Sequence, residues 1–300
     1  MAGGIGERFW PLSTPEHPKQ LLPFGKGGNT LLQDALDRIL PILPKENIWL
    51  ATSVEMKDIF APLCLLPGEQ IIAEPSRKNT AGCLSYIMAN LLAKFGELAK
   101  DIVVAVLTAD QIIDPIDDFI KAVTCIMDYV TEQRVLGIIG IPPTRPETGF
   151  GYIEVGDMIN QDKGSEIYTV KKFHEKPDKQ VAETYIKAGS YFWNSGMFFW
   201  KVQTFLDEIK KTSPVHWDVI MQMSEQIQKG NMDKVKDIFQ RLPNISIDYA
   251  LMERTKNIVM VKANFQWDDL GSWTSLERIM PRDENGNIVQ GNVILLKSTN

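Results

Sequence analysis

The sequence is short of histidine and cysteine, and both shortages narrow the chemistry it can support. Its three histidines stand far apart, with no spacing suited to a shared metal ion, so each reads best as a surface or core residue. Its three cysteines are scattered, odd in number and set among apolar residues. These features favour reduced core thiols in a cytoplasmic protein over a disulfide framework or a zinc site. The cysteines are Cys64, Cys83 and Cys125.

The sequence also lacks an excess of basic residues and a long apolar run. Its 300 residues carry a formal net charge of −6, which argues against non-specific binding to nucleic acid or to an anionic membrane. No apolar run approaches the roughly 18 residues that a membrane-spanning helix needs. No signal peptide precedes the first glycines. An anionic ligand would therefore need a local cluster of positive charges, because the protein as a whole is negatively charged.

What remains is an ordinary globular composition, with 44% apolar and 23% charged residues. The length suits one large domain or two unequal ones. After Pro281 the pattern changes to short β-like segments with Asn-Gly turns over residues 287–296. We predict a main domain over residues 1–280 and the beginning of a truncated C-terminal β region over residues 281–300.

The first residues form a glycine-rich stretch, with Gly3, Gly4 and Gly6 followed by Arg8 and Lys19. Glycine lets backbone N–H groups crowd close to a ligand, and consecutive N–H groups form an anion-binding concavity. A flexible leader is the alternative interpretation, but large apolar residues follow at once, which is unusual in a disordered segment. Neither G-x-x-x-x-G-K-[ST] nor G-x-G-x-x-G is present. We predict a polyphosphate cradle of a different kind.

Strand and helix patterns alternate along the first half of the chain. Alternation of this kind predicts an α/β fold with a sheet built from βαβ units, whose ligands lie beyond the carboxyl ends of the strands. A phosphate loop in such a fold normally follows a buried strand, yet only Met1 and Ala2 precede Gly3. The predicted strands are 47–52, 70–74, 102–107 and 135–141, and the predicted helices are 31–40, 55–61, 79–95 and 116–130.

The second half is less regular. Strand 193–200 is rich in aromatic residues and begins near two polar ones, Asn194 and Ser195. The predicted strands are 148–155, 168–173, 193–200 and 258–261, and the predicted helices are 178–187, 202–211, 215–228, 231–240, 247–254 and a last one after residue 273.

Two acidic positions are candidate metal ligands. Asp110 closely follows the apolar strand 102–107, where an acidic residue is either a helix cap or a ligand. Asp268 and Asp269 lie far along the chain beside a Gly-containing turn, where capping of the next helix is the alternative. Mg²⁺ typically takes one or two carboxylates and completes its octahedron with waters and substrate phosphates. Two aspartates from distant segments that lie beside a phosphate-binding loop would provide these carboxylate ligands for Mg²⁺.

Further polar residues suit a hydroxyl-rich phosphorylated ligand. Glu175 and Lys176 follow a predicted strand. They could form a solvent-exposed ion pair with no role in binding. Beside a ligand cleft, Lys176 could instead bind a phosphate and Glu175 could accept hydrogen bonds from sugar hydroxyls. Asn194 both donates and accepts hydrogen bonds, and Gly149 and Gly151 allow close backbone approach. No nucleophile is paired with a base in the sequence. Direct phosphoryl or nucleotidyl transfer needs none, because positioning and charge neutralisation carry it.

Taken together, these segments resemble the sugar-phosphate nucleotidyltransferases, and the fuller set resembles their mannose-1-phosphate guanylyltransferase branch. The matches follow the family order and cover nearly the whole chain. One such motif alone is a weak signal, but eight in order are a strong one. They are residues 3–13 with 18–20, 74–81, 107–110, 148–153, 173–177, 193–198, 246–253 and 267–273.

The resemblance implies a Rossmann-like nucleotidyltransferase fold with a mixed, mainly parallel central sheet flanked by helices. It also implies that GTP and mannose 1-phosphate react to give GDP-mannose and pyrophosphate, with Mg²⁺ as cofactor. By motif match the loop glycines would line the triphosphate, and Arg8 and Lys19 would neutralise it. Asp110 and Asp269 would hold Mg²⁺; Asp269 is preferred to Asp268 because the family's aspartate directly precedes a Leu-Gly pair.

The resemblance also assigns the remaining site residues. Lys176 would bind the sugar phosphate. The mannose would contact Gly149, Glu175 and Asn194, and the base and ribose would lie near Glu74, Asn79 and Thr80.

Two departures from the family pattern stand out. Gln111 occupies a position where many relatives have histidine, with little expected effect on the metal. The strand before Gly3 is absent, and the chain stops where relatives continue into a small β-helix, which affects oligomerisation more than catalysis. A homodimer is one option for the assembly. The alternatives in function are a related enzyme with another sugar or nucleotide, and a non-catalytic GDP-sugar-binding regulatory subunit.

Overall fold

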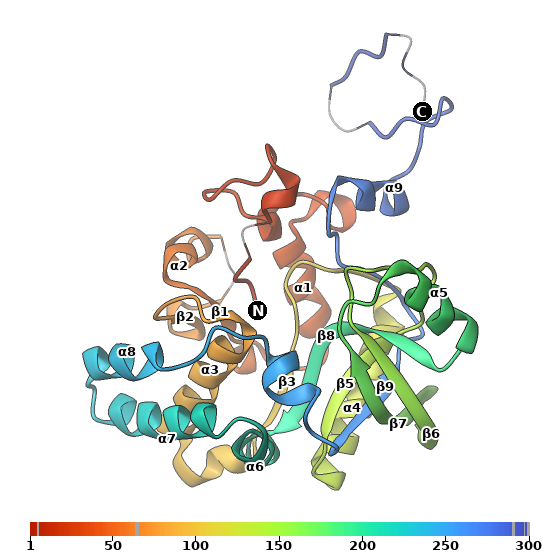
Figure 1. Ribbon diagram of the computed structural model, residues 1–300. Coiled ribbons are helices and arrows are strands. Elements are labelled where there is room, and N and C mark those ends of the chain that lie inside the picture. Colours follow the sequence, from red (N-terminus) through yellow and green to blue (C-terminus); the bar gives the residue numbers. More distant parts are fainter. Residues whose placement is uncertain (5, 64–65, 290–291, 297, 299–300) are drawn as a thin grey trace.

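The computed structural model describes residues 1–4, 6–63, 66–289, 292–296 and 298. Its centre is a six-stranded sheet with helices on both faces (Figure 1). The strands lie in the order β3-β8-β5-β9-β7-β6. Their bounds are Val103–Val106 for β3, Leu136–Ile141 for β5, Tyr152–Asp162 for β6, Ser165–His174 for β7, Tyr191–Lys201 for β8 and Ile258–Lys262 for β9.

The α/β fold class is confirmed, but the expectation of a mainly parallel sheet is wrong. Strand β8 lies between β3 and β5 and runs antiparallel to both, and β6 and β7 form an antiparallel hairpin. Among the described strands of this sheet, only β5 and β9 pair in parallel. The cause is the aromatic strand β8, which is apolar on both faces: Phe198 and Trp200 point to one core cluster, and Met197 and Phe199 to the other. Such a strand is suited to the centre of a sheet.

A second, two-stranded parallel sheet pairs β1 (Leu50–Ser53) with β2 (Ile71–Glu74). The short helix α2 (Val54–Phe60) follows β1, and α1 (Leu31–Ile39) begins at Thr30, whose hydroxyl accepts a hydrogen bond from the Gln33 N–H. Threonine is one of the residues preferred at this position of a helix.

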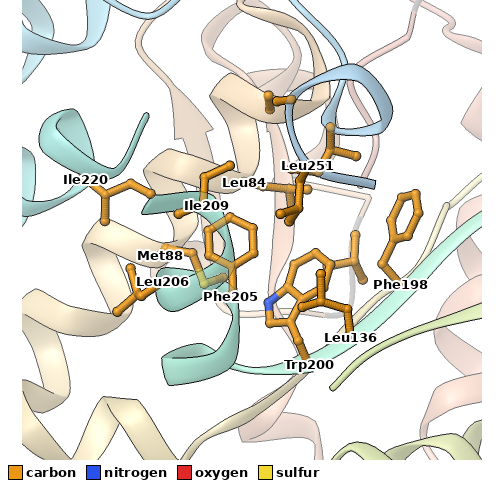
Figure 2. Packing of buried hydrophobic residues seen from close by; sticks show 14 of the residues in the cluster. Leu84, Met88, Leu136, Phe198, Trp200, Phe205, Leu206, Ile209, Ile220 and Leu251 are labelled. Carbon is orange, nitrogen blue, oxygen red and sulfur yellow. The ribbon is translucent and has the colours of Figure 1, made fainter. Parts of the chain in front are cut away.

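Helices cover the two faces of the central sheet. The face with Trp200 packs against α3, α6, α7 and α8, and the opposite face packs against α4 and α5. Figure 2 shows the first of these cores, where Leu84 and Met88 lie close to Phe205 and Trp200. The bounds are Asn79–Phe95 for α3, Ile116–Gln133 for α4, Lys179–Ala188 for α5, Val202–Thr212 for α6, Pro214–Gln228 for α7 and Met232–Gln240 for α8.

Three short elements differ from expectation. Strand β4 (Ile112–Asp114) pairs antiparallel with β10 (Gln266–Asp268) and brings the segment after Asp110 beside Asp268. The predicted helix 247–254 is a single π-helical turn, η7 (Asp248–Met252). Turns of this kind occur frequently at functional sites.

The C-terminal segment leads away from the body of the molecule after α9 (Leu276–Ile279) (Figure 1). Within residues 281–289 and 292–296 there is no strand, so the predicted β segments are not found there; residues 290–291 lie outside the described part. A strand needs a neighbour to satisfy its backbone groups, and the described segment instead turns on itself, with the Asn287 N–H donating to Asp283. The division at residue 280 stays a prediction.

None of the described helices is long and apolar enough to cross a membrane. Cys125 is buried and Cys83 half-buried, and both are free thiols. Cys64 lies outside the described residues.

Candidate active site

The glycine-rich loop is held on the body of the protein rather than loose. Gly6 has φ +74°, and a Cβ at this position would overlap the Cβ of Lys19, so the close approach admits only glycine. The Ser13 hydroxyl donates to the Gly6 carbonyl at 2.5 Å, and the Gln20 amide donates to the Gly4 carbonyl at 3.1 Å. The described loop residues are therefore fixed by the segment that carries Lys19.

Gly3 and Gly4 differ from Gly6. Both are exposed, neither has a positive φ, and a Cβ at either position would meet no atom within 4 Å. The protein's own packing therefore does not require glycine there. The absence of side chains leaves the backbone open to a ligand, as the predicted phosphate cradle requires.

Lys19 joins the loop to both predicted metal ligands. Its side chain is buried, and its Nζ donates to the Asp110 carboxylate at 3.1 Å and to the Asp269 backbone carbonyl at 2.5 Å. Three residues predicted separately from distant segments thus meet at one point. We call Lys19, Asp110 and Asp269 the Lys19 cluster.

Burial affects the Asp269 carboxyl. Burial raises its pKa, the positive charges of Lys19 and Arg8 oppose the shift, and the negative charges of Asp268 and Asp110 add to it. A side chain at Gly271 would contact both the Asp269 carboxylate and the Arg8 guanidinium. Arg8 therefore lies beside the Lys19 cluster, as predicted.

Asp268 has a different task from its neighbour. Its carboxylate is buried and accepts two hydrogen bonds from Arg278, at 2.6 and 3.0 Å, and one from the Leu270 N–H at 2.9 Å. All of these contacts lie close together along the chain. Asp268 thus shapes the turn that presents Asp269, which agrees with the preference for Asp269 as the ligand.

The residues present fit a hard divalent cation. No described residues form a group of three or more His, Cys, Asp or Glu side chains that could hold a metal by themselves. Asp110 and Asp269, both next to Lys19, provide two carboxylates, the number that Mg²⁺ commonly takes when substrate phosphates and waters complete its shell. This donor set is compatible with a cation that arrives with a nucleotide.

The second part of the site is built around Asn194, near the start of β8. Its amide donates to the Asp248 carboxylate at 2.7 Å, and its side-chain oxygen accepts from the Gly196 N–H at 2.8 Å. A Cβ at Gly151 would collide with the Glu175 carboxylate and contact Asn194. Glu175 and Asn194, two of the three residues predicted to bind the sugar, therefore lie together beside Gly151; sugar binding stays a prediction.

The carboxyl groups in this region have raised pKa values, chiefly because they are buried. Burial and the charge of Asp248 raise the pKa of Glu175, and burial raises that of Asp248. Burial, with the charges of Glu175 and Asp248, also raises the pKa of Glu253. The nearby cation is Lys176, which is exposed, adopts φ +45° and lies 3.5 Å from Glu175. Its reach into solvent suits capture of a phosphate.

Gln111 connects the two parts of the site. It directly follows Asp110, and its amide donates to the Ser195 carbonyl, next to Asn194, at 2.8 Å. Its side-chain oxygen accepts from the Trp267 indole at 2.9 Å. The side-chain methyl of Thr108 would also contact a Cβ at Gly196, at 3.8 Å. The Lys19 cluster and the Asn194 region are therefore adjacent.

The residues predicted for the base and ribose lie at the start of α3 and the end of β2. Glu74 is buried, and burial raises its pKa to about 7; one of its carboxylate oxygens has no partner among the described residues. Asn79, the first residue of α3, adopts φ +60°, and its side-chain oxygen accepts from the Thr80 N–H. The Thr80 hydroxyl accepts from the Ile247 N–H at 2.8 Å, so Thr80 supports the turn that carries Asp248.

Gly149 is less integrated than the other predicted residues. It is exposed, and its N–H donates to Glu147. Arg145, which the sequence reasoning missed, lies over the Trp193 ring with 4.9 Å to its centroid. Asp248 was missed as well, although its segment, residues 246–253, was one of the eight motifs. An acidic residue inside a recognised motif is the signal that could have singled it out.

The fold and this site place the chain in a known class. The chain belongs to the nucleotidyl transferase family, whose model matches residues 1–286. Among curated proteins it is 36% identical to the mannose-1-phosphate guanylyltransferase of Escherichia coli K12, over the whole chain and 63% of that protein. It is 34% identical to the enzyme of the same name from Salmonella muenchen, over 99% of the chain and 62% of that protein. The chain thus spans about three fifths of the length of these relatives.

Solved structures agree on the fold. The structure described as mannose-1-phosphate geranyltransferase from Thermus thermophilus superposes with a TM-score of 0.83 at 33% identity, over 97% of this chain and 81% of that one. A UDP-glucose pyrophosphorylase solved with UDP-glucose superposes at 0.56 with 15% identity, over 90% and 91% of the two chains, and supports the fold alone.

Proposed function

We propose that this chain is a nucleotidyltransferase that makes GDP-mannose and pyrophosphate from GTP and mannose 1-phosphate. The observation that carries the proposal is the Lys19 cluster, where one buried ammonium joins a glycine loop to the Asp110 carboxylate and to the backbone carbonyl of Asp269, two residues from distant segments. The relatives named mannose-1-phosphate guanylyltransferase support the choice of substrates, because their likeness covers nearly the whole chain.

In the proposed reaction, a phosphate oxygen of mannose 1-phosphate attacks the α-phosphorus of GTP. The new P–O bond forms as the bond between the α-phosphorus and the oxygen bridging to the β-phosphate breaks, and pyrophosphate leaves. The N–H groups at Gly3 and Gly4 and the cations of Arg8 and Lys19 would stabilise the growing charge on the phosphoryl oxygens. Mg²⁺, held by Asp110 and Asp269, would supply further charge neutralisation when bound.

The sugar phosphate would lie on the Asn194 side. Lys176 would bind its phosphate and align the attacking oxygen, while Glu175 and Asn194 would take the mannose hydroxyls, with Gly149 close by. The Asp248 carboxylate and the Gly196 N–H both hydrogen-bond the Asn194 side chain, so its amide group keeps a defined direction. Glu74, Asn79 and Thr80 would face the base and ribose, with Thr80 acting through the turn before Asp248.

The decisive experiment is a pyrophosphate-release assay with four nucleoside triphosphates against mannose 1-phosphate, glucose 1-phosphate and one further sugar 1-phosphate. We expect release only with GTP and mannose 1-phosphate together, dependent on a divalent cation. Pyrophosphate release with another pair of substrates would show that the enzyme uses a different nucleotide or sugar. Binding of GDP-mannose with no turnover for any pair would overturn it in favour of a regulatory subunit.

A matched pair of lysine variants tests the division into two substrate sides. Lys176→Met should raise KM for mannose 1-phosphate strongly and KM for GTP little. Lys179→Met, also an exposed lysine close by in sequence, is the control and should change neither. An equal rise in both KM values for Lys176→Met would contradict the assignment.

A cytoplasmic location and a homodimer remain predictions. Light scattering on the purified chain, with and without GDP-mannose, would measure the assembly directly.

A further inference from the structure

Four polar side chains from four different elements meet in one cluster on the α5 side of the central sheet. They are Glu154 of β6, His174 of β7, Tyr185 of α5 and Tyr191 of β8, and we call them the His174 cluster. The proposed reaction uses none of them. All four are half-buried, so their polar atoms need partners within the protein.

Both ring nitrogens of His174 are engaged. Nε2 lies 3.2 Å from a carboxylate oxygen of Glu154, and Nδ1 lies 3.0 Å from the hydroxyl of Tyr185. Because an ionised carboxylate only accepts hydrogen bonds, the neutral imidazole carries its N–H on Nε2, and Nδ1 then accepts from the Tyr185 hydroxyl. One ring thus joins β6 to α5 across the end of β7.

The Tyr185 hydroxyl belongs to a packed side chain. Its ring stacks on the Tyr191 ring, with 4.0 Å between the centroids and 10° between the planes, and it meets the Tyr152 ring at 5.3 Å. The His174 ring lies 5.1 Å from the Tyr185 ring and 5.6 Å from the Tyr191 ring. Aromatic contacts at these distances stabilise a defined arrangement, so the hydroxyl reaches His174 from a fixed direction.

The cluster spans the turn over residues 175–177, which carries the predicted sugar-side charges. His174 is the last residue of β7, and Asp178 is the N-cap of α5. The bond between His174 and Tyr185 therefore connects the strand before the turn to the helix after it. Successive side chains of a strand point to opposite faces, so the residue that follows His174 can lie beside Asn194 while the imidazole faces α5.

The turn itself contains a costly backbone conformation. Lys176 has φ +45°, in the left-handed region that a residue other than glycine adopts only when its surroundings hold it there. Its side chain is 64% exposed, so packing of that side chain does little to fix the backbone. The conformation depends instead on how the two ends of the turn are anchored.

We propose that His174 is a positioning residue for the sugar side of the reaction. Through its bonds to Glu154 and Tyr185 it fixes the turn that presents Glu175 and Lys176 to mannose 1-phosphate. This inference rests on the proposed function for the identity of the substrate. His174 touches no substrate, and its effect passes through the backbone of the turn. Binding of GTP, which involves other segments, should not depend on it.

The test removes a single hydroxyl. Tyr185→Phe breaks the bond to His174 and keeps the aromatic stack on Tyr191. The control, Tyr168→Phe, removes a hydroxyl of β7 that is also half-buried and donates to Glu166 at 2.6 Å. We expect Tyr185→Phe to raise KM for mannose 1-phosphate by about tenfold and to leave KM for GTP unchanged, whereas the control changes neither. Pyrophosphate release measures both constants.

Hydrogen exchange in the first turn of α5 gives a readout that does not depend on catalysis. The Val181 N–H donates to the Asp178 carboxylate and the Ala182 N–H to the Asp178 carbonyl, both at 2.9 Å. Loss of the connection from strand to helix should speed the exchange of these two amides by about tenfold in Tyr185→Phe. The control should exchange like the parent.

A second substitution checks that the two tyrosine and histidine groups act as one pair. His174→Phe keeps an aromatic ring and removes both bonds, so it should raise KM for mannose 1-phosphate at least as much as Tyr185→Phe. Adding Tyr185→Phe to it should cause no further rise, because the bond between the two residues is already lost.

Equal exchange in Tyr185→Phe and its control would overturn the proposal, and so would equal KM values for mannose 1-phosphate. Faster exchange with the same rise in both KM values would also overturn it, since His174 would then support the fold without placing the turn. A parent that releases no pyrophosphate with any substrate pair refutes the proposed function, and the exchange comparison then still decides whether His174 holds the turn.

Discussion

The carboxyl groups on the two sides of the site differ in their partners. Near the glycine loop, Asp110 pairs with buried Lys19, and Asp268 pairs with Arg278. On the other side, Glu175 reaches only the exposed Lys176, and Asp248 has an amide rather than a cation as its direct partner. Glu74 has no ion pair among the described residues.

This difference separates two uses of the same chemistry. The pair of Asp110 with Lys19 joins distant segments of the chain, whereas a buried carboxyl group with a raised pKa and no close cation is costly to the folded protein. Perturbed groups of that kind gather at functional sites, because a ligand relieves the cost. Asp269 is also a group of this second kind, since burial raises its pKa. In the proposed function, the Lys19 ion pair would be in place before substrate binds, and the carboxyl groups with raised pKa would gain partners on binding.

The largest expected effect is on the phosphate side. Asp110→Asn keeps the shape of the side chain but removes the charge, and Lys19 retains its bond to the Asp269 carbonyl. We expect turnover to fall by about 10²–10³-fold, and Tm to fall as well because buried Lys19 loses its ion pair; pyrophosphate release and thermal unfolding measure the two effects. The control is Asp233→Asn, at a fully exposed aspartate of α8. Near-normal turnover in Asp110→Asn would show that the paired carboxylate is structural only.

The next effect concerns Glu74 and stability. Its pKa rises from the ordinary 4.5 to about 7 in the fold. The folded state therefore binds this proton more tightly than the unfolded chain, so the stabilising contribution is full below about pH 4.5 and is lost as pH rises through 7. Glu74→Gln should then be more stable than the parent at pH 8, by about 2–3 kcal/mol, and equal to it near pH 4.5.

Urea unfolding at the two pH values measures this difference. Glu69→Gln, at an exposed residue nearby, is the control and should show no pH-dependent gain. If Glu74→Gln shows no gain at pH 8 either, the Glu74 carboxyl is not held unpaired. Activity of the variant should fall if Glu74 contacts the nucleotide.

A smaller effect is expected at Asp248. Asp248→Asn keeps an acceptor for the Asn194 amide and removes the charge that raises the pKa of Glu175. Because the pKa of Glu175 should fall in Asp248→Asn, we expect the acidic limb of this variant's pH–rate profile to move to lower pH. Asp248→Ala also removes the acceptor and should raise KM for mannose 1-phosphate by about 10- to 100-fold. Identical profiles for both variants and the parent would remove Asp248 from the site.

The smallest effect separates two adjacent residues. Asp268→Asn weakens the bidentate pair with Arg278 and should lower stability by about 1–2 kcal/mol. Asp269→Asn removes an acid whose pKa burial raises, so its stability should be equal or higher, while its activity is lost. Unfolding and turnover measured side by side check the contrast. The reverse pattern would exchange the roles of the two aspartates.

Local elements of the fold were predictable from the sequence. Helix α3 spans the predicted residues, and α1 begins at the predicted residue 31, because both depend on the spacing of apolar residues within a few turns. The insertion of β8 between β3 and β5 was not predictable. An apolar pattern shows that a strand is buried, but it does not show which distant strand is its neighbour. The three-residue strands β4 and β10 carry too few residues to show any period.

In the site, too, the residues within recognised motifs were predictable, and those that depend on long-range contacts were not. Gly6, Lys19, Asp110 and Asp269 were assigned by motif, and the structure brings them together. Asp248 depends on a contact 54 positions away in sequence, to Asn194, and on a π-helical turn that no local pattern marks. Its place in the site is therefore a property of the folded chain.

Met1 has a practical consequence for anyone who prepares this protein. Its amine and its carbonyl are both bonded within the sheet, so the first residue is an internal structural part. Loss of this residue from a preparation would remove both bonds, so samples with and without it would differ in stability. Intact-mass measurement of each batch is accordingly the first requirement before any variant is compared with its parent.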